Sequence, residues 1–153
     1  MGKAEILKGE TDGAMSLSSR TARVFTRRWM RQKTSKRMAS ATTVVNARFV
    51  KPLDSELLMR LAHSKQLIVT VEDAYLAGGF GSAVLELLEE NGLSDRIKVV
   101  RMGVPDHIVT HGDPNLLLAK YGLDADGIYS RVVETLEAMD ERQVNKKRIK
   151  AVK

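Results

Sequence analysis

The stretch from residue 67 to residue 88, LIVTVEDAYLAGGFGSAVLELL, constrains the fold of this chain most strongly. Its first five residues are apolar or β-branched, which is typical of a strand buried on both faces of a sheet. A glycine cluster follows, and apolar residues then recur at helical spacing from Val84 to Leu88. A strand, a glycine loop and a helix make half of a βαβ unit, so a sheet of parallel strands is expected.

Segments of the same kind flank this stretch. Residues 42–50 and 97–102 are rich in β-branched residues, and each predicts a strand. Asp54 and Asp113 suit the N-cap of a helix, and a last helix is expected to begin at residues 124–126. The whole pattern predicts an α/β domain, namely a three-layer sandwich of about five mostly parallel strands flanked by helices.

The 153 residues are expected to form one domain with a short segment at each end. Residues 1–12 are interpreted as an extended lead-in, residues 13–139 as the α/β domain, and residues 140–153 as a basic, disordered tail. Within the domain, residues 16–40 are atypical, because they are rich in Arg, Ser, Thr and Met and contain no acid. The only candidate for a strand near the start of the domain is the segment 14–17.

The net charge of +6 comes from one part of the chain. Ten of the 25 basic residues, and none of the 19 acidic residues, lie between Gly13 and Leu53. The rest of the chain is therefore net acidic, and the overall charge is no argument for nucleic-acid binding by the whole protein. Arginines of this segment could bind phosphates while Phe25 and Trp29 stack on bases, but the segment has no recognisable nucleic-acid motif.

Composition excludes several classes of protein. The chain has no cysteine, which rules out disulfides, thiolate catalysis and cysteine-ligated metals. No apolar run approaches the roughly 20 residues needed to span a bilayer, and the first ten residues lack the apolar core of a secretory signal. We therefore expect a cytoplasmic protein with no membrane partner.

Two acids leave the carboxyl end of the central strand, where open α/β sheets place functional groups. Glu72 is expected to accept hydrogen bonds from loop amides, and the adjacent Asp73 points elsewhere, so the two do not make an acid–base pair. The glycine cluster at residues 78–82 could cradle a phosphate at the start of the next helix. It matches neither phosphate-binding glycine motif, and a structural role in close backbone approach is favoured.

Two histidines, His107 and His111, are four residues apart, as are paired metal ligands on a helix. Pro105 and Gly112 argue against a helix there, and the sequence offers no third ligand nearby. We therefore predict no metal site.

Three passages, taken together, resemble the C-terminal domain of 1-deoxy-D-xylulose-5-phosphate synthases. They are VVNARFVKPLD (44–54), LIVTVEDAYLAGGFGSAVLELL (67–88) and VVRMGVPDHIVTHGDPNLLLAKYGLDADGI (99–128). A similar domain closes transketolases and the β subunits of 2-oxoacid dehydrogenases, but those lack the GLDAxGI ending. The chain departs from the family mildly at Asp73 and His107, and seriously at residues 16–40, where the family has an apolar strand and an Ala/Glu-rich helix. One hypothesis is that these residues are read out of frame.

The resemblance implies a part of a larger enzyme. The family condenses pyruvate with glyceraldehyde 3-phosphate, using thiamine diphosphate and Mg²⁺ that two preceding domains bind. Their GDG motif is absent here, so the resemblance implies no catalytic, cofactor-binding or metal-binding residue in this chain. It implies packing against those preceding domains, and a homodimer.

Loops at the strand ends are the candidates for facing the active site or a domain interface: Glu72, Gly78, Gly79, Gly81, Ser82 and His111. Two alternatives stay open. The chain could be a free-standing basic α/β module that binds nucleic acid or an acidic partner. It could also be the last domain of another transketolase or of a 2-oxoacid dehydrogenase β subunit.

Overall fold

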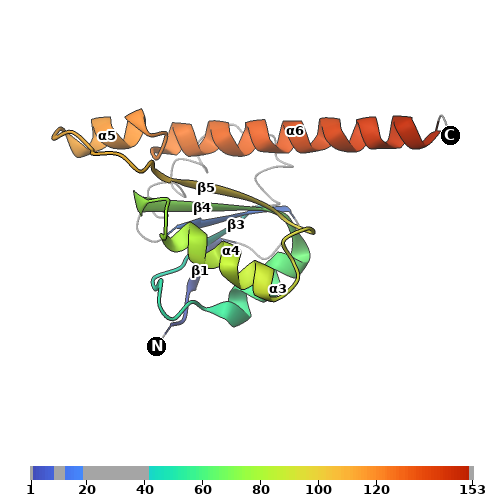
Figure 1. The fold of residues 1–153 in the computed structure, drawn as a ribbon, viewed down its shortest axis with the longest axis horizontal. Coiled ribbons are helices and arrows are strands. Elements are labelled where there is room, and N and C mark those ends of the chain that lie inside the picture. Colours follow the sequence, from blue (N-terminus) through green and yellow to red (C-terminus); the bar gives the residue numbers. More distant parts are fainter. Residues whose placement is uncertain (1, 9–12, 19–41, 152–153) are drawn as a thin grey trace.

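A computed structural model of the chain describes residues 2–8, 13–18 and 42–151 (Figure 1). These residues form an α/β domain with one five-stranded sheet in the order β1-β3-β2-β4-β5. The strands are β1 (Glu5–Lys8), β2 (Gly13–Ser18), β3 (Thr43–Asn46), β4 (Lys65–Tyr75) and β5 (Lys98–Val104). Strands β2 to β5 pair in parallel, and only β1 is antiparallel, to β3. The predicted fold class is confirmed.

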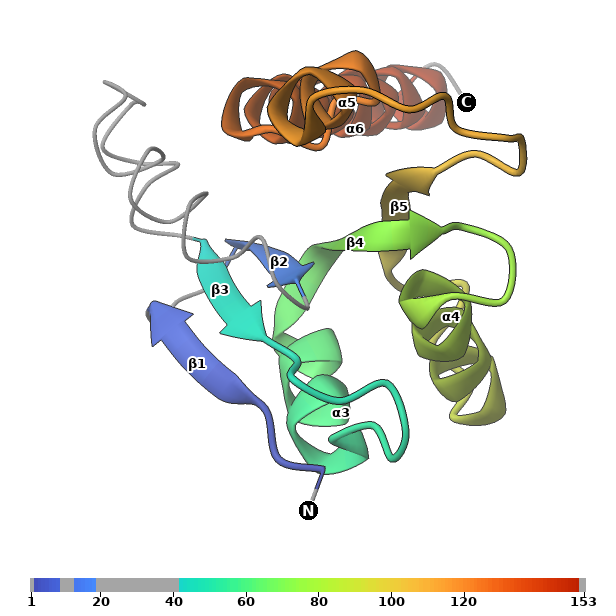
Figure 2. The same cartoon turned by 90° about the vertical axis from the view of Figure 1, so that its left-hand side faces the viewer.

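Four described helices cover the sheet and make three layers. Helices α3 (Ser55–Ser64) and α4 (Phe80–Glu90) lie on one face, and α6 (Ala125–Ala151) lies on the other, together with the short helix α5 (Pro114–Lys120) (Figure 2). Asp54 is the N-cap of α3 and accepts a hydrogen bond from the backbone N–H of Leu57, as predicted. Asp113 is the N-cap of α5 and accepts from the backbone N–H groups of Asn115 and Leu116, also as predicted. In the described part of the chain, no helix combines the length and apolar character needed to cross a membrane.

The alternation of side chains along β4 divides the core into two halves. Leu67, Val69 and Val71 pack against α6, whereas Ile68 packs against α3 and α4, because successive residues of a strand point to opposite faces. Ile68 and Glu72 are an even number of residues apart, so Glu72 also points toward α4. This alternation places Glu72, near the carboxyl end of β4, beside the start of α4.

The α6 half of the core is completed by one face of that helix. Ile128 and Val132 are buried, and Leu136 and Met139 pack against the same cluster. These residues recur at helical spacing, as the sequence predicts. Burial of each fully enclosed aliphatic side chain contributes about 1.5–3 kcal/mol, so this stripe is what holds α6 on the sheet.

Two boundaries differ from those expected. The segment interpreted as a lead-in contributes β1, which pairs along β3, and the Ala4 N–H donates to Asp54 Oδ2 at 2.9 Å. The tail expected to be disordered after residue 139 continues α6 to Ala151 (Figure 1). Its sequence is rich in Lys and Arg and holds neither Gly nor Pro, so local propensity sustains the helix.

The segment 14–17 is the centre of β2, which lies between β3 and β4. Of the atypical residues 16–40, only 16–18 belong to the described part of the chain. The hypothesis that they are read out of frame therefore concerns residues outside the described ranges.

Candidate functional site

The site begins near the carboxyl end of β4, at Glu72. Its side chain is 2% exposed, although a carboxylate is normally found in water. Burying a charged group is costly unless hydrogen bonds replace its hydration. The environment of Glu72 must therefore supply donors, and the nearest element is the first turn of α4.

Glu72 closes the N-terminus of α4. The backbone N–H of Phe80 donates to Glu72 Oε2 at 2.6 Å, and the N–H of Gly81 donates to Oε1 at 2.9 Å. The N-cap residue of α4 is Gly79, which has no side chain to accept these bonds, so Glu72 accepts them from across the loop. The positive end of the helix dipole also favours a carboxylate there. The predicted bonding of Glu72 to loop amides is confirmed.

Two glycines make this contact possible. A β-carbon on Gly79 would meet Glu72 Oε2 and the carbonyl oxygen of Tyr75 well inside contact distance. A β-carbon on Gly81 would lie 2.7 Å from Thr70 Oγ1 and 2.9 Å from Arg101 Cδ. The structural interpretation of the glycine cluster therefore holds at both positions.

A second set of bonds ties the same loop to β5. Ser82 Oγ donates to the carbonyl oxygen of Leu76 at 3.0 Å. Arg101 Nη1, from β5, donates to that carbonyl oxygen at 3.1 Å and to Ser82 Oγ at 2.9 Å. The sequence gives no sign of this role for Arg101, because only the pairing of β4 with β5 brings a residue so distant in sequence to the loop.

The histidines do not join this site. His111 is exposed, and no hydrogen bond or ion pair among the described residues connects it with Glu72. His107 Nε2 lies 3.0 Å from the hydroxyl oxygen of Tyr121, and both residues belong to the segments around α5. Within the described ranges, no three His, Asp or Glu side chains are grouped as a metal site requires.

Two acids elsewhere, Asp54 and Glu56, have clearly shifted pKa values. Asp54 is buried, which would raise the pKa of its carboxyl group. The backbone N–H groups of Ala4 and Leu57, together with the Lys3 ammonium 3.8 Å away, outweigh burial and hold that pKa below its usual value. Lys3 also donates to Glu56 at 2.8 Å, which lowers the pKa of Glu56 and raises that of Lys3. This cluster joins the start of β1 to α3, so its role is structural.

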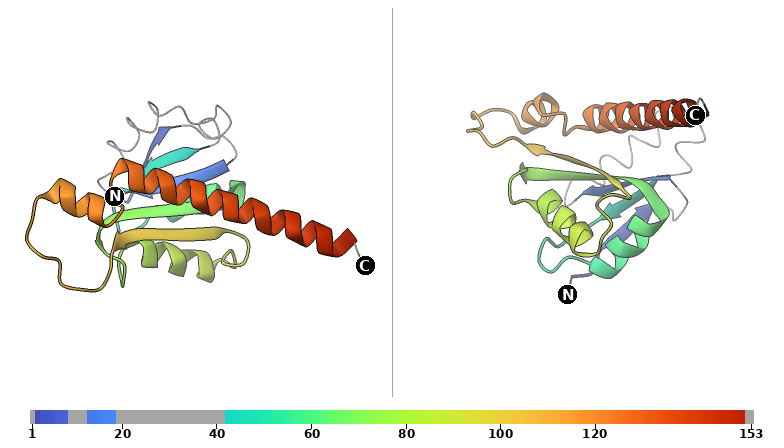
Figure 3. Two further views of the ribbon diagram at one scale, coloured as in Figure 1. Left: turned by 90° about the horizontal axis from the view of Figure 1, so that it is seen from above. Right: turned by 45° about the vertical axis from the view of Figure 1, so that its right-hand side comes forward.

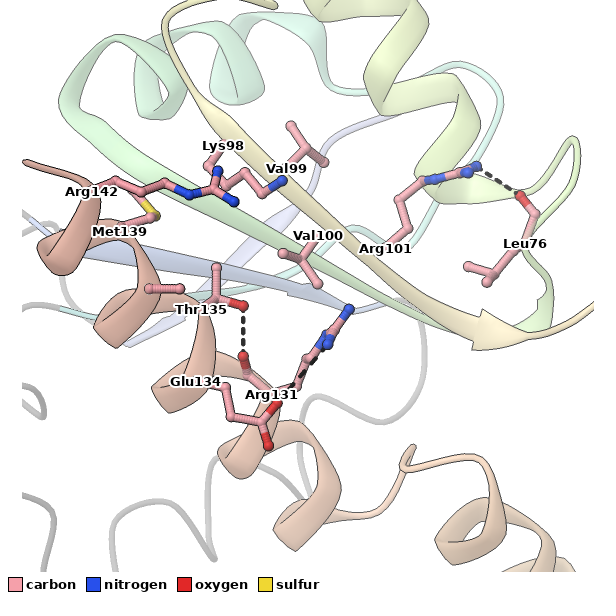
Figure 4. Close-up of a pocket in the computed structure, with 11 residues that line it drawn as sticks. Leu76, Lys98, Val99, Val100, Arg101, Arg131, Glu134, Thr135, Met139 and Arg142 are labelled. Atoms are coloured by element: carbon pink, nitrogen blue, oxygen red, sulfur yellow. Dashed lines mark hydrogen bonds and ion pairs between the residues drawn. The ribbon is translucent and has the colours of Figure 1, made fainter. Parts of the chain in front are cut away.

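A cavity of about 360 Å³ lies between β5 and α6 (Figure 4). Two cations from different elements, Lys98 and Arg142, lie side by side at one end of it (Figure 4). Within the described residues, neither has a bond to an acid, and the one acid of the lining, Glu134, lies 3.9 Å from Arg131. Its lining residues are Leu76, Lys98, Val99, Val100, Arg101, Arg131, Glu134, Thr135, Ala138, Met139 and Arg142.

The N-terminus of α4 does not fit a thiamine diphosphate site. A diphosphate needs a helix N-terminus or cations, and Mg²⁺ needs several oxygen ligands. The first two N–H groups of α4 are already bonded to Glu72, whose charge would repel a diphosphate. The described part of the chain also offers no cluster of acids for a metal ion. No chemistry of this cofactor is therefore assigned to these residues.

Comparison with known proteins identifies the family of the chain. The family described as "Transketolase, C-terminal domain" matches residues 32–128. The chain is 43% identical over 135 residues to 1-deoxy-D-xylulose-5-phosphate synthase 1 of Geobacter metallireducens, covering 86% of this chain and 20% of that protein. It is 42% identical over 142 residues to 1-deoxy-D-xylulose-5-phosphate synthase of Symbiobacterium thermophilum, covering 91% of this chain and 21% of that protein.

A solved structure is similar over most of the chain. It is titled "Split gene transketolase, inactive beta4 tetramer", and it matches with a TM-score of 0.70 and 31% identity. The match covers 89% of this chain and 43% of that one. The present chain spans only about a fifth of the length of the two curated relatives above. The chain thus belongs to the transketolase C-terminal domain family, and within it the chain is similar to the domain of 1-deoxy-D-xylulose-5-phosphate synthases.

Proposed function

We propose that the chain serves as the C-terminal, non-catalytic domain of a 1-deoxy-D-xylulose-5-phosphate synthase. The observation that carries this proposal is the use of Glu72, whose two carboxylate oxygens are both bonded to the α4 backbone. Glu72, the acid best placed to act at the carboxyl edge of the sheet, therefore has a structural role. The sequence identity with two such synthases over most of this chain supports the assignment to that enzyme.

The whole enzyme would condense pyruvate with glyceraldehyde 3-phosphate and release carbon dioxide. Thiamine diphosphate supplies a stabilised carbanion for such a step when it is bound, and we assign its binding, with that of Mg²⁺, to the domains that precede this one. The residues of this chain would contribute a rigid sheet and the surfaces on which those domains pack. We further propose that the enzyme is a cytoplasmic homodimer.

The test uses a chimera in which this chain replaces the matched fifth of the Geobacter metallireducens synthase. The chimera is expected to convert pyruvate and glyceraldehyde 3-phosphate at a rate comparable to the parent enzyme. This chain alone is expected to show neither turnover nor heat of binding when titrated with thiamine diphosphate and Mg²⁺. Turnover by the chain alone would contradict the proposal, and so would a folded chimera that binds the cofactor without activity.

A second function, the binding of an acidic partner by a free-standing module, is favoured by the cavity between β5 and α6. Four basic residues line it against one acid. An acidic peptide is expected to bind this chain with an affinity that falls as salt rises. The double variant Lys98→Ala, Arg142→Ala should weaken binding, whereas Lys120→Ala, which removes a cation over the Tyr121 ring, should not. An oligonucleotide titrated in parallel shows whether the cavity prefers nucleic acid or an acidic protein segment.

A further inference from the structure

Large apolar side chains are exposed at one end of the molecule. Tyr75 is 49% exposed, Leu116 72% and Ile108 91%. Tyr75 ends β4, Ile108 lies in the loop after β5, and Leu116 is in α5. These three residues, named here the carboxyl-edge patch, all follow the carboxyl ends of β4 and β5. An exposed group of large apolar residues marks an interaction surface more often than an accident of folding.

An apolar cavity of about 340 Å³ lies within the same segments. It adjoins the patch directly, because Tyr75 lines it and the chain neighbours of Ile108 and Leu116 line it as well. Asp73 is the only charged residue among the described residues of the lining, and it is exposed. The lining residues are Asp73, Ala74, Tyr75, Val104, Val109, Pro114, Leu117, Leu118, Tyr121 and Leu123.

Helix α5 is short and only partly packed, with Leu118 against the core. It has seven residues, and none of them is buried. A helix this short gains little from its own hydrogen bonds, and packing of an apolar face normally holds it. Figure 3 shows α5 and the loop before it extending past the end of the sheet. The exposed face of α5 is therefore available for a partner.

The topology places the start of the chain at the same edge. Because β1 is antiparallel, Glu5 pairs with Asn46, the last residue of β3. Residues 2–4 therefore lie at the edge where β4 and β5 also end. Residues 2–4 lie beside β1 and the patch lies beside β5, at opposite sides of the sheet, but both are at its carboxyl end. About four fifths of each curated relative lies outside the matched part, and a polypeptide that precedes this domain would reach the sheet at that end.

We propose that the carboxyl-edge patch is the surface on which the preceding domain of the same polypeptide packs. This inference rests on the proposed function and adds the surface that the partner covers. The partner would present apolar side chains to the cavity and a basic side chain to Asp73. Covering Tyr75, Ile108 and Leu116 would also stabilise α5, because its exposed side would then be packed as well.

The absence of cysteine from this chain permits a direct test by thiol labelling. The variant Ile108→Cys carries the only thiol of the chain, and Val144→Cys, at an exposed position of α6, is the matched control. Each is prepared as this chain alone and within the chimera, and alkylation at that residue is followed by mass spectrometry. Cys at position 108 should react about tenfold more slowly in the chimera than in the chain alone, because the interface limits access of the reagent. Cys at position 144 should react equally in both.

Equal labelling at position 108 in the chain alone and in an active chimera would overturn this inference and leave the proposed function intact. An inactive chimera with a native sequence would instead count against the proposed function. A second measurement addresses another occupant of the patch. If the chain alone forms a dimer that Ile108→Asp with Leu116→Asp dissociates, the patch binds a second copy and the inference is overturned.

Discussion

The backbone of Gly79 lies so close to the carboxylate of Glu72 that no β-carbon fits between them. The same carboxylate accepts hydrogen bonds from the two residues that follow Gly79. A strand end, a glycine loop and a helix start are thereby fixed as one unit. The acid that stands where α/β enzymes often place a catalytic group is bound in this unit instead.

The first prediction concerns Gly79→Ala. The added methyl group would collide with Glu72 and with the carbonyl oxygen of Tyr75, and neither the buried carboxylate nor the backbone can move freely. We expect the free energy of unfolding to fall by about 1–3 kcal/mol, the usual cost of overpacking a tight site. Urea unfolding of the chain followed by circular dichroism measures it.

Gly78 provides a matched control, because its constraint is of another kind. It has a φ of +67°, and nothing lies within 4 Å of a β-carbon built there. Gly78→Asn should cost little, since Asn tolerates the left-handed region, whereas Gly79→Asn should be as harmful as Gly79→Ala. Equal effects of Asn at the two positions would contradict the assignment of Gly79 to close packing.

The second prediction concerns Glu72. Glu72→Ala leaves the N–H groups of Phe80 and Gly81 buried without their acceptor, so we expect a loss of about 1–3 kcal/mol of stability. Glu72→Gln keeps one acceptor oxygen and should lose less. In the chimera, both variants should lower the unfolding temperature while leaving the KM for pyruvate unchanged. A lower kcat in a variant of unchanged stability would show that Glu72 acts in catalysis.

The unit around Glu72 could be predicted from the sequence because all of its parts are adjacent in the chain. The buried run of β4, the acid at its end and the glycines follow one another within fifteen residues, and each has a strong local preference. The three passages that resemble the synthases also predict the family correctly. Arg101 could not be predicted, because its bonds to Leu76 and Ser82 depend on the register of β4 against β5.

The ends of the chain were harder to predict for a different reason. Residues 5–8 have only a weak strand pattern. They form a strand because they pair with β3, a tertiary contact that the local sequence does not reveal. Beyond residue 139, the apolar stripe of α6 ends while helix-forming residues continue, so periodicity and propensity point to different boundaries. His111 lies in the loop between β5 and α5, so the strand, glycine and helix pattern that positions Glu72 does not apply to it.

The third prediction follows from the lowered pKa of Asp54. A carboxyl group whose pKa is lower in the folded state than in the unfolded state stabilises the fold above the unfolded pKa, and this contribution is lost as pH falls through the folded value. Burial of Asp54 works against this, but the N–H groups of Ala4 and Leu57 and the ammonium of Lys3 outweigh it. We therefore expect stability to drop on acidification below about pH 4, as this carboxyl group becomes protonated.

Asp54→Asn is the control for this effect. Its amide oxygen can still accept from Leu57 as the N-cap of α3, while the charge that lowers the pKa is gone. The variant should be less stable than the native chain at pH 7 and should approach it at pH 3, in urea titrations at each pH. Parallel pH profiles for the two proteins would remove Asp54 as the source of the acid dependence.

The last prediction concerns the far half of α6. Among the residues of this helix whose side chains are described, Met139 is the last that packs against the core, and Val144 beyond it is exposed. A chain that ends at Asp140 should therefore have the same free energy of unfolding in urea as the full chain, within about 0.5 kcal/mol. Its helical circular dichroism signal should decrease. A chain that ends at Thr135 also loses Leu136 and Met139, so it should be less stable by about 2 kcal/mol or more. If the two truncations lower the free energy of unfolding equally, residues after Asp140 contribute to the folded core. The helix would then be held by more than its apolar stripe.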